Sequence, residues 1–168
     1  VCSSDLLRKG VTFQNGDPVT SDDVKFTWDR YKGASAKLLK DAVASLETPD
    51  ERTAIFKLKE PWPDFMTFFI LASGACWILP RKYIEKVGDA AFKKQPIGAG
   101  PYKLTSMEAG VELVMDAFEG YWRKMPSVKR LVFKTVPDPT TRAAMVKNGE
   151  VDIAYMLDVP SAQELKRD

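Results

Sequence analysis

Eight residues at positions 95–102, QPIGAGPY, contain two prolines and two glycines and interrupt an otherwise periodic chain. Proline fixes φ and removes a backbone donor, and glycine weakens helices and strands, so no regular element is expected to run through this segment. Helical and strand-like periodicities alternate on both sides of it. We therefore expect an α/β protein built from two sub-structures that meet near Gln95.

The first half predicts a strand, a turn and a helix in succession. Residues 7–13 have the character of a strand, and Asn15-Gly16 is a strong turn signal because both residues tolerate positive φ. A capping box at Thr20 and Asp23 predicts that a helix begins there. The apolar residues of that helix recur at helical spacing, which predicts one buried face.

A β-hairpin and two further helices are predicted next. Residues 42–46 and 53–58 flank the turn TPDE, and Ala54, Phe56 and Leu58 alternate with more polar positions. The aromatic-rich residues 64–71 predict one helix, and residues 81–88 predict another that Pro80 opens and Gly88 closes.

The second half predicts strands at residues 102–107 and 111–117, followed by a β-α-β unit. That unit comprises a strand at 129–136, a helix at 138–148 with Asp138 as its N-cap, and a strand at 151–156. A last helix is predicted near Ser161, where Ser161 and Glu164 form a second capping box.

Composition argues against several functional classes. The 25 basic and 23 acidic residues are interspersed and give a net charge of +2, so no basic face suggests nucleic-acid binding. The longest apolar run, residues 65–77, is too short to cross a bilayer. The chain has no histidine, which removes the commonest general base and metal ligand, and leaves Cys76 without an activating imidazole. We predict no catalytic residues, no metal site and no cofactor.

Trp77 is the leading candidate for a ligand contact. It ends the small-residue loop SGACW, and tryptophan combines a large apolar surface with a polar N–H, as binding clefts require. Ser73 and Cys76 in the same loop are weaker candidates. The alternative is that Trp77 belongs to the hydrophobic core.

Five segments, in order, resemble those of the peptide- and nickel-binding class of ABC-importer solute-binding proteins. They are LRKGVTFQNGDPVTSDDVKFTWDR, TAIFKLKEPWPDFM, WILPRKYIEKVG, PIGAGPYKL and NGEVDIA, and the resemblance as a whole extends over essentially all of the chain from Leu7 onward. The resemblance implies a fold like that of type II periplasmic-binding proteins, with three lobes in a chain several times longer. Parts of two lobes are then expected here, with the third missing.

The resemblance also implies a domain assignment. Residues 7–94 would be part of the small second lobe, and residues 95–168 part of the first lobe, leading toward the missing third. Residues 1–6 depart from the family pattern, so we expect them to be a cloning or assembly remnant that lies outside the packed body. The predicted strand that ends at Met156 and Asp158 would border the ligand chamber, and Asp158 would either contact the ligand or cap a helix.

The expected function is that of a substrate-binding component. It would capture short peptides in the periplasm, or outside the cytoplasm on a membrane anchor, and deliver them to ABC permease subunits. Nickel complexes or oligosaccharides are alternative cargoes of the same class. A hydrolase with paired carboxylates is an alternative of another class, for which no motif is present.

Overall fold

The computed structural model describes residues 2–70, 75 and 77–165. Its contacts divide the chain into two compact units, which are described separately. One comprises Val1–Leu104 with Asp116–Arg130, and the other comprises Thr105–Met115 with Leu131–Asp168. The first boundary between the units therefore lies after the proline- and glycine-rich segment, between Leu104 and Thr105. The assignment of residues 7–94 and 95–168 to two lobes stays a prediction.

The predicted capping box starts a helix where expected. Helix α1 spans Ser21–Arg30, and the Asp23 carboxylate accepts hydrogen bonds from the backbone N–H (2.8 Å) and the hydroxyl (2.9 Å) of Thr20. Trp28 and Tyr31 on its apolar face pack against the hydrophobic core. The helix and its buried face are therefore confirmed.

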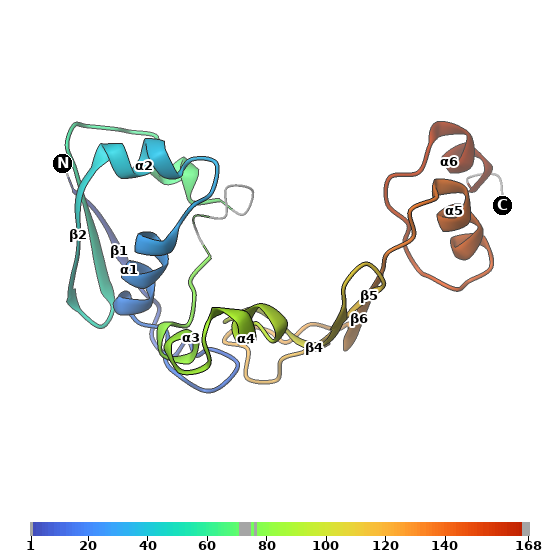
Figure 1. Cartoon of the computed structure of the whole chain (residues 1–168), viewed down its shortest axis with the longest axis horizontal. Helices are drawn as coiled ribbons and strands as arrows, with labels where there is room; N and C mark the ends of the chain where they lie inside the picture. Colours follow the sequence, from blue (N-terminus) through green and yellow to red (C-terminus); the bar gives the residue numbers. More distant parts are fainter. Residues whose placement is uncertain (1, 71–74, 76, 166–168) are drawn as a thin grey trace. The chain divides into compact units, whose positions relative to one another are not determined.

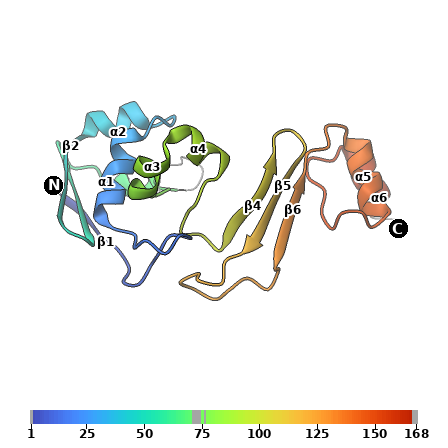
Figure 2. The same cartoon turned by 60° about the horizontal axis from the view of Figure 1, so that its bottom comes forward.

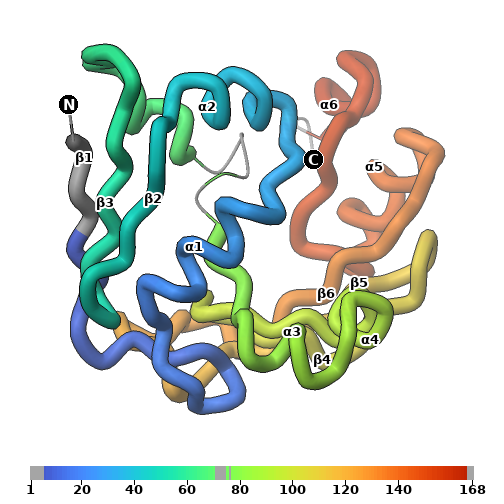
Figure 3. The backbone as a smooth tube through the Cα atoms, turned by 60° about the vertical axis from the view of Figure 1, so that its left-hand side comes forward, coloured from blue at the N-terminus to red at the C-terminus, as the bar shows by residue number. Residues whose placement is uncertain are grey.

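The first sheet has the strand order β1-β3-β2, with β1 at Cys2–Leu6, β2 at Val43–Asp50 and β3 at Thr53–Leu58 (Figure 3). Both pairings are antiparallel. The hairpin is confirmed, but its turn falls at residues 51–52, because β2 continues to Asp50.

Two expectations at the start of the chain are wrong. Residues 2–6 do not lie outside the packed body, since β1 pairs along its length with β3, from Cys2 opposite Lys57 to Leu6 opposite Thr53. Residues 7–13 form no strand, because the chain turns at Gly10, where φ is 75°. The predicted turn at Asn15-Gly16 is confirmed, with φ of 90° at Gly16 and a bridge between Thr12 and Pro18.

The core lies between this sheet and the helices that contact it, α1 and α2 (Ala36–Ala42) (Figure 1). Leu39, Val43, Phe56, Leu58 and Phe65 form its buried cluster. The predicted alternation in β3 is confirmed, because Ala54, Phe56 and Leu58 are all buried. Phe56 is central: its ring centroid lies 5.2 Å from that of Trp28, 5.4 Å from Phe69 and 5.5 Å from Phe65.

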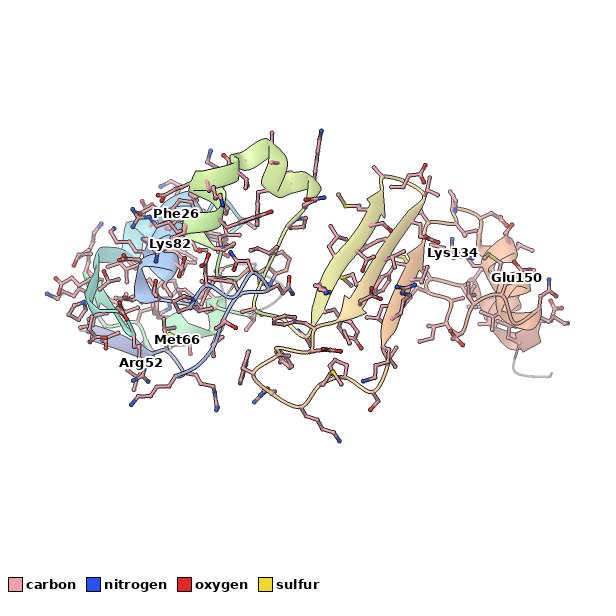
Figure 4. The ribbon with its side chains drawn as sticks, turned by 90° about the horizontal axis from the view of Figure 1, so that it is seen from below. Phe26, Arg52, Met66, Lys82, Lys134 and Glu150 are labelled. Atoms are coloured by element: carbon pink, nitrogen blue, oxygen red, sulfur yellow. The ribbon has the colours of Figure 1, made fainter. Side chains whose placement is uncertain are left out.

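Three short helices follow in this unit. A helix is predicted at 64–71, and within its described residues, 64–70, the aromatic segment forms only the 3-10 helix η1, Phe65–Phe68. Its Phe65 side chain is buried while Met66 is 42% exposed (Figure 4). Helix α3 spans Arg81–Val87 as predicted, with Pro80 at its start and Gly88 (φ 83°) at its end, and α4 follows at Asp89–Lys94.

The second sheet has the order β4-β5-β6, at Tyr102–Glu108, Glu112–Ala117 and Arg130–Lys134 (Figure 2). Ala117 N–H donates to the Lys129 carbonyl and Thr135 N–H to that of Val111, so β5 and β6 run in opposite directions. All three predicted strands are confirmed. The division between the two units passes through this sheet.

Helix α5 follows at Pro139–Lys147, where Asp138 caps it by accepting from Thr141 N–H (2.6 Å), and α6 spans Val159–Leu165. The strand predicted at 151–156 is absent, so the β-α-β unit is not formed. Instead, the carbonyls of Tyr155 and Met156 accept hydrogen bonds from the Arg142 guanidinium at 3.0 and 2.7 Å. In the described part of the chain, no helix is both long and apolar enough to span a membrane.

We expect Phe56→Ala to lower the free energy of unfolding by about 3–5 kcal/mol, because it opens a cavity where three aromatic rings meet. Lys57→Ala is the matched control. Lys57 is the next residue of β3, with an exposed side chain paired to Glu47, and such a pair contributes about 0–1 kcal/mol. Chemical denaturation measures both changes. Equal losses would contradict the placement of Phe56 at the centre of the core.

Candidate functional site

Described residues of the first unit line at least three hollows, and two of these have structural explanations. The 480 Å³ hollow at the start of α1 is rich in carboxylates, but most of these already have partners. Asp23 accepts from Thr20, Asp50 from Arg52 N–H (2.8 Å) and Glu85 from Arg81 (2.9 Å). Within the described residues, no group of three His, Cys, Asp or Glu could hold a metal ion.

The second hollow, of 200 Å³, belongs to the hydrophobic core. Trp28, Phe56 and Phe69 line it together with other apolar side chains. It offers a ligand few polar groups, and its aromatic lining is the same that packs α1 onto the sheet.

The third hollow contains the leading candidate, Trp77. It has a volume of 420 Å³, and its lining comes entirely from the first unit. The lining residues are Leu7, Arg8, Val11, Val19, Trp77, Ile78, Gly98, Ala99, Gly100 and Trp122. We call this the Trp77 cavity. Its volume and its combination of apolar surface with a few polar groups fit a small-molecule site.

Trp77 itself is 60% exposed, so the alternative that it belongs to the core is wrong. An exposed indole at the mouth of an apolar hollow has surface to offer a ligand. Ser73 and Cys76, the weaker candidates of the same loop, lie outside the described residues.

Helix α1 fixes the wall that contains Trp77 and Ile78. The hydroxyl of Thr27, a buried side chain, accepts the N–H of Leu79 at 2.8 Å. The carboxylate of Asp23, also buried, accepts the N–H of Arg81 at 2.8 Å. These two bonds hold the extended chain directly after Trp77 against a helix whose own position is set by core packing.

Gln14 fixes the wall formed by residues 98–100. Its side-chain oxygen accepts Gly98 N–H at 3.1 Å, and its amide nitrogen donates to the Tyr102 carbonyl at 2.7 Å. Its own N–H donates to the Gly98 carbonyl at 2.9 Å. One side chain thus joins the turn before α1 to the glycine-rich segment more than 80 residues later.

Arg52, at the hairpin turn, fixes the wall that contains Leu7 and Arg8 (Figure 4). Its guanidinium donates two hydrogen bonds to the Leu7 carbonyl, at 3.0 and 2.7 Å, and its carbonyl accepts Leu7 N–H at 2.8 Å. Leu7 therefore continues the line of β1 for one residue before the chain turns into the cavity wall.

Trp122 completes the cavity from the segment between β5 and β6. Phe118 N–H donates to the Pro101 carbonyl at 2.8 Å, and Tyr121 N–H donates to the Phe118 carbonyl at 3.1 Å. Two guanidinium groups lie over the Trp122 ring, that of Arg8 at 4.9 Å from the centroid and that of Arg123 at 4.8 Å.

The other two candidates, Met156 and Asp158, belong to the second unit, and a shared chamber with Trp77 stays a prediction. Met156 is 89% exposed, with a positive φ of 54°. Asp158 caps α6 by accepting the N–H of Ser161 at 2.8 Å, which is the helix-cap alternative. The hydrogen bonds from Ser161 lower the pKa of the Asp158 carboxyl.

Sequence reasoning missed most of the cavity lining. Leu7, Arg8 and Trp122 were not singled out, and residues 98–100 were interpreted only as a turn at the junction. Arg8 was visible as part of the LRKGV segment. No sequence signal connected Trp122 to Trp77, because the two meet only through the return of the chain after β5.

Comparisons with known proteins agree on one family. The model of the bacterial extracellular solute-binding proteins, family 5 middle region, matches residues 6–168. The glutathione-binding protein GsiB of Salmonella choleraesuis is 32% identical over 167 residues, which cover 96% of this chain and 32% of GsiB.

Two solved structures are similar in fold. NikZ from Campylobacter jejuni in complex with Ni(L-His) aligns with a TM-score of 0.84 and 27% identity, over 100% of this chain and 34% of NikZ. Haemophilus influenzae OppA in complex with RPPGFSPFR aligns with a TM-score of 0.83 and 25% identity, over 99% of this chain and 37% of OppA. The chain thus spans about a third of the length of these relatives.

We expect Gln14→Ala to lower the free energy of unfolding by about 1–3 kcal/mol, because it leaves Gly98 N–H and the Tyr102 carbonyl without their partner. Asn15→Ala is the control, since the Asn15 amide bonds only to the nearby exposed Asp17. Thermal or chemical unfolding measures both, and hydrogen exchange at Gly98 should accelerate only in Gln14→Ala. Unchanged exchange at Gly98 would contradict the role given to Gln14.

The cap on α6 should be sensitive to acid. Because the folded pKa of Asp158 is lowered, its stabilisation is present above the unfolded pKa of about 3.9 and is lost as the pH falls through the folded value. Carboxyl-carbon NMR should show this lowered midpoint, with fraying of α6 below it. Asp158→Asn keeps an acceptor that does not titrate, so its α6 should lose the acid response; identical responses would contradict the cap.

Proposed function

Because this chain belongs to family 5 of the bacterial extracellular solute-binding proteins, we propose that the protein carrying it is the substrate-binding component of an ABC transporter that captures short peptides. The observation that carries the proposal is the family match over residues 6–168. GsiB, named for binding glutathione, and OppA, solved with a nine-residue peptide, support a peptide cargo.

The Trp77 cavity supplies one part of the peptide site in this proposal. Its apolar residues accept a side chain, and the exposed indole of Trp77 packs against it. Gly100 adds backbone without a side chain, and no described residue lies within 4 Å of the position that a Cβ would occupy, so a ligand has open access to the main chain at that point. Peptide backbones are recognised by such main-chain groups.

No bond is made or broken in this function. The protein binds the solute by closing around it and transfers it to membrane permease subunits, which are its proposed partners. Members of the family are extracellular solute-binding proteins. We place this protein in the periplasm, or outside the cytoplasm on a membrane anchor.

A nickel complex is the second candidate cargo, because the similar NikZ structure contains Ni(L-His). The described residues offer no group of three His, Cys, Asp or Glu for a bare ion. At these residues, a nickel cargo would therefore be held through its own chelating ligands, and the cavity would contact the organic part of the complex.

We expect Trp77→Ala in the full-length protein to weaken peptide binding by about 1–3 kcal/mol, the range for loss of a large aromatic contact. Stability should change little, because the side chain is 60% exposed. Isothermal titration calorimetry with a pool of di- to nonapeptides measures affinity, and thermal melting measures stability.

Phe26→Ala is the matched control, since Phe26 is an aromatic residue of α1 outside the cavity lining (Figure 4). It should leave peptide affinity unchanged. Loss of affinity in both variants would point to a general effect on folding. If the wild-type protein binds no peptide in the pool but binds a nickel–histidine complex, the second cargo replaces the first.

A further inference from the structure

The cation pair over Trp122 stands apart from the other arginines of the chain. Five of the seven arginines in the described residues donate to carboxylates or carbonyls. Arg8 and Arg123 have no hydrogen bond or ion pair within the same part of the chain, and the guanidinium group of each lies over the Trp122 ring. Both guanidinium groups are therefore free to bind an anion.

The arrangement places two positive charges at one indole ring. Because the guanidinium carbons lie 4.9 and 4.8 Å from the same ring centroid, they are at most about 10 Å apart, and the charges repel each other. The π face of the indole offsets part of that repulsion. A bound anion would relieve the remainder, and planar guanidinium groups match the two oxygens of a carboxylate.

The Trp77 cavity beside this pair of charged side chains is mostly apolar. Among the described residues, Arg8 is the one ionisable side chain in the cavity lining, and none of those lining residues is a carboxylate that would compete for the guanidinium. Leu7, Val11, Val19 and Trp77 make the remaining surface mostly apolar. An apolar hollow with an unpaired cation at its edge suits a ligand that joins an apolar group to a carboxylate.

We propose that Arg8 and Arg123, held over Trp122, form a carboxylate-binding subsite at the edge of the Trp77 cavity. Its ligand is the carboxylate end of a solute whose neighbouring apolar group enters the cavity; for a peptide, this is the C-terminal residue. The proposal deepens the function proposed above and rests on it for the identification of the solute as a peptide.

The test uses the full-length protein and two pairs of probes. N-acetylphenylalanine is compared with N-acetylphenylalaninamide, and trileucine with trileucine amide, by isothermal titration calorimetry. We expect each acid to bind about tenfold or more tightly than its amide, because a charged hydrogen-bonded pair is lost in the amide. Arg8→Gln and Arg123→Gln should each reduce this preference, and Arg8→Lys should retain part of it.

Lys124→Gln is the matched control, since it removes an exposed positive charge next to Arg123 that has no recorded contact with Trp122. Its preference for acids should equal that of the wild-type protein, and all variants should melt at the wild-type temperature. Equal affinity for acids and amides, or a preference that survives in both glutamine variants, would overturn the subsite.

The outcomes separate this inference from the proposed function. Peptide binding with no preference for the free acid overturns the subsite and leaves peptide capture standing. Binding of N-acetylphenylalanine with an acid preference, but of no peptide, supports the subsite and overturns the peptide cargo. Binding of none of the probes overturns both.

Discussion

Every wall of the Trp77 cavity is irregular backbone, and such backbone is stable only where its N–H and C=O groups find partners. Four side chains provide them: Gln14, Thr27, Asp23 and Arg52 bond to main-chain groups at residues 98–102, 79, 81 and 7. Three of the four stand on or beside helix α1 or the β-hairpin. The core fixes the position of α1 and the β-hairpin. The hydrogen bonds from these elements then fix the loops that form the cavity, which lie outside the core.

The core can fix these elements because its buried residues form one cluster that includes Phe56. Phe56 contacts three other aromatic rings, and its cluster includes residues from α2, β2, β3 and η1. Burial of large aromatic side chains contributes much of the free energy of folding in a domain of this size. The cavity, in contrast, exposes its own tryptophan, and Arg8 in its lining and the nearby Arg123 have no anionic partner among the described residues. Groups of this kind stabilise the protein little and are available for a ligand.

Local sequence signals predicted the elements that local physics controls. The capping box at Thr20 and Asp23, the turn at Gly16, the alternation in β3 and the cap at Asp138 all appear where expected. Besides the aromatic segment, which forms the 3-10 helix η1, the failures include two strands. Residues 2–6 lack a strand-like pattern yet pair with β3, whereas residues 151–156 have such a pattern but meet no neighbouring strand in the described structure. A strand depends on a distant partner, and periodicity does not reveal whether one is there.

The candidate site also depends on contacts between residues that are distant in the chain. By itself the sequence determined the family resemblance, the mixed helix and sheet composition and the choice of Trp77, because each depends on residues that are close together in the chain. Only the tertiary structure decided that Arg8 and Trp122, more than a hundred positions apart, line one hollow with Trp77, and that Asp158 caps a helix. Contacts between residues so far apart form only because the chain folds back on itself. Hydrogen bonds such as those from Gln14 to Gly98 and Tyr102 hold the chain in that path.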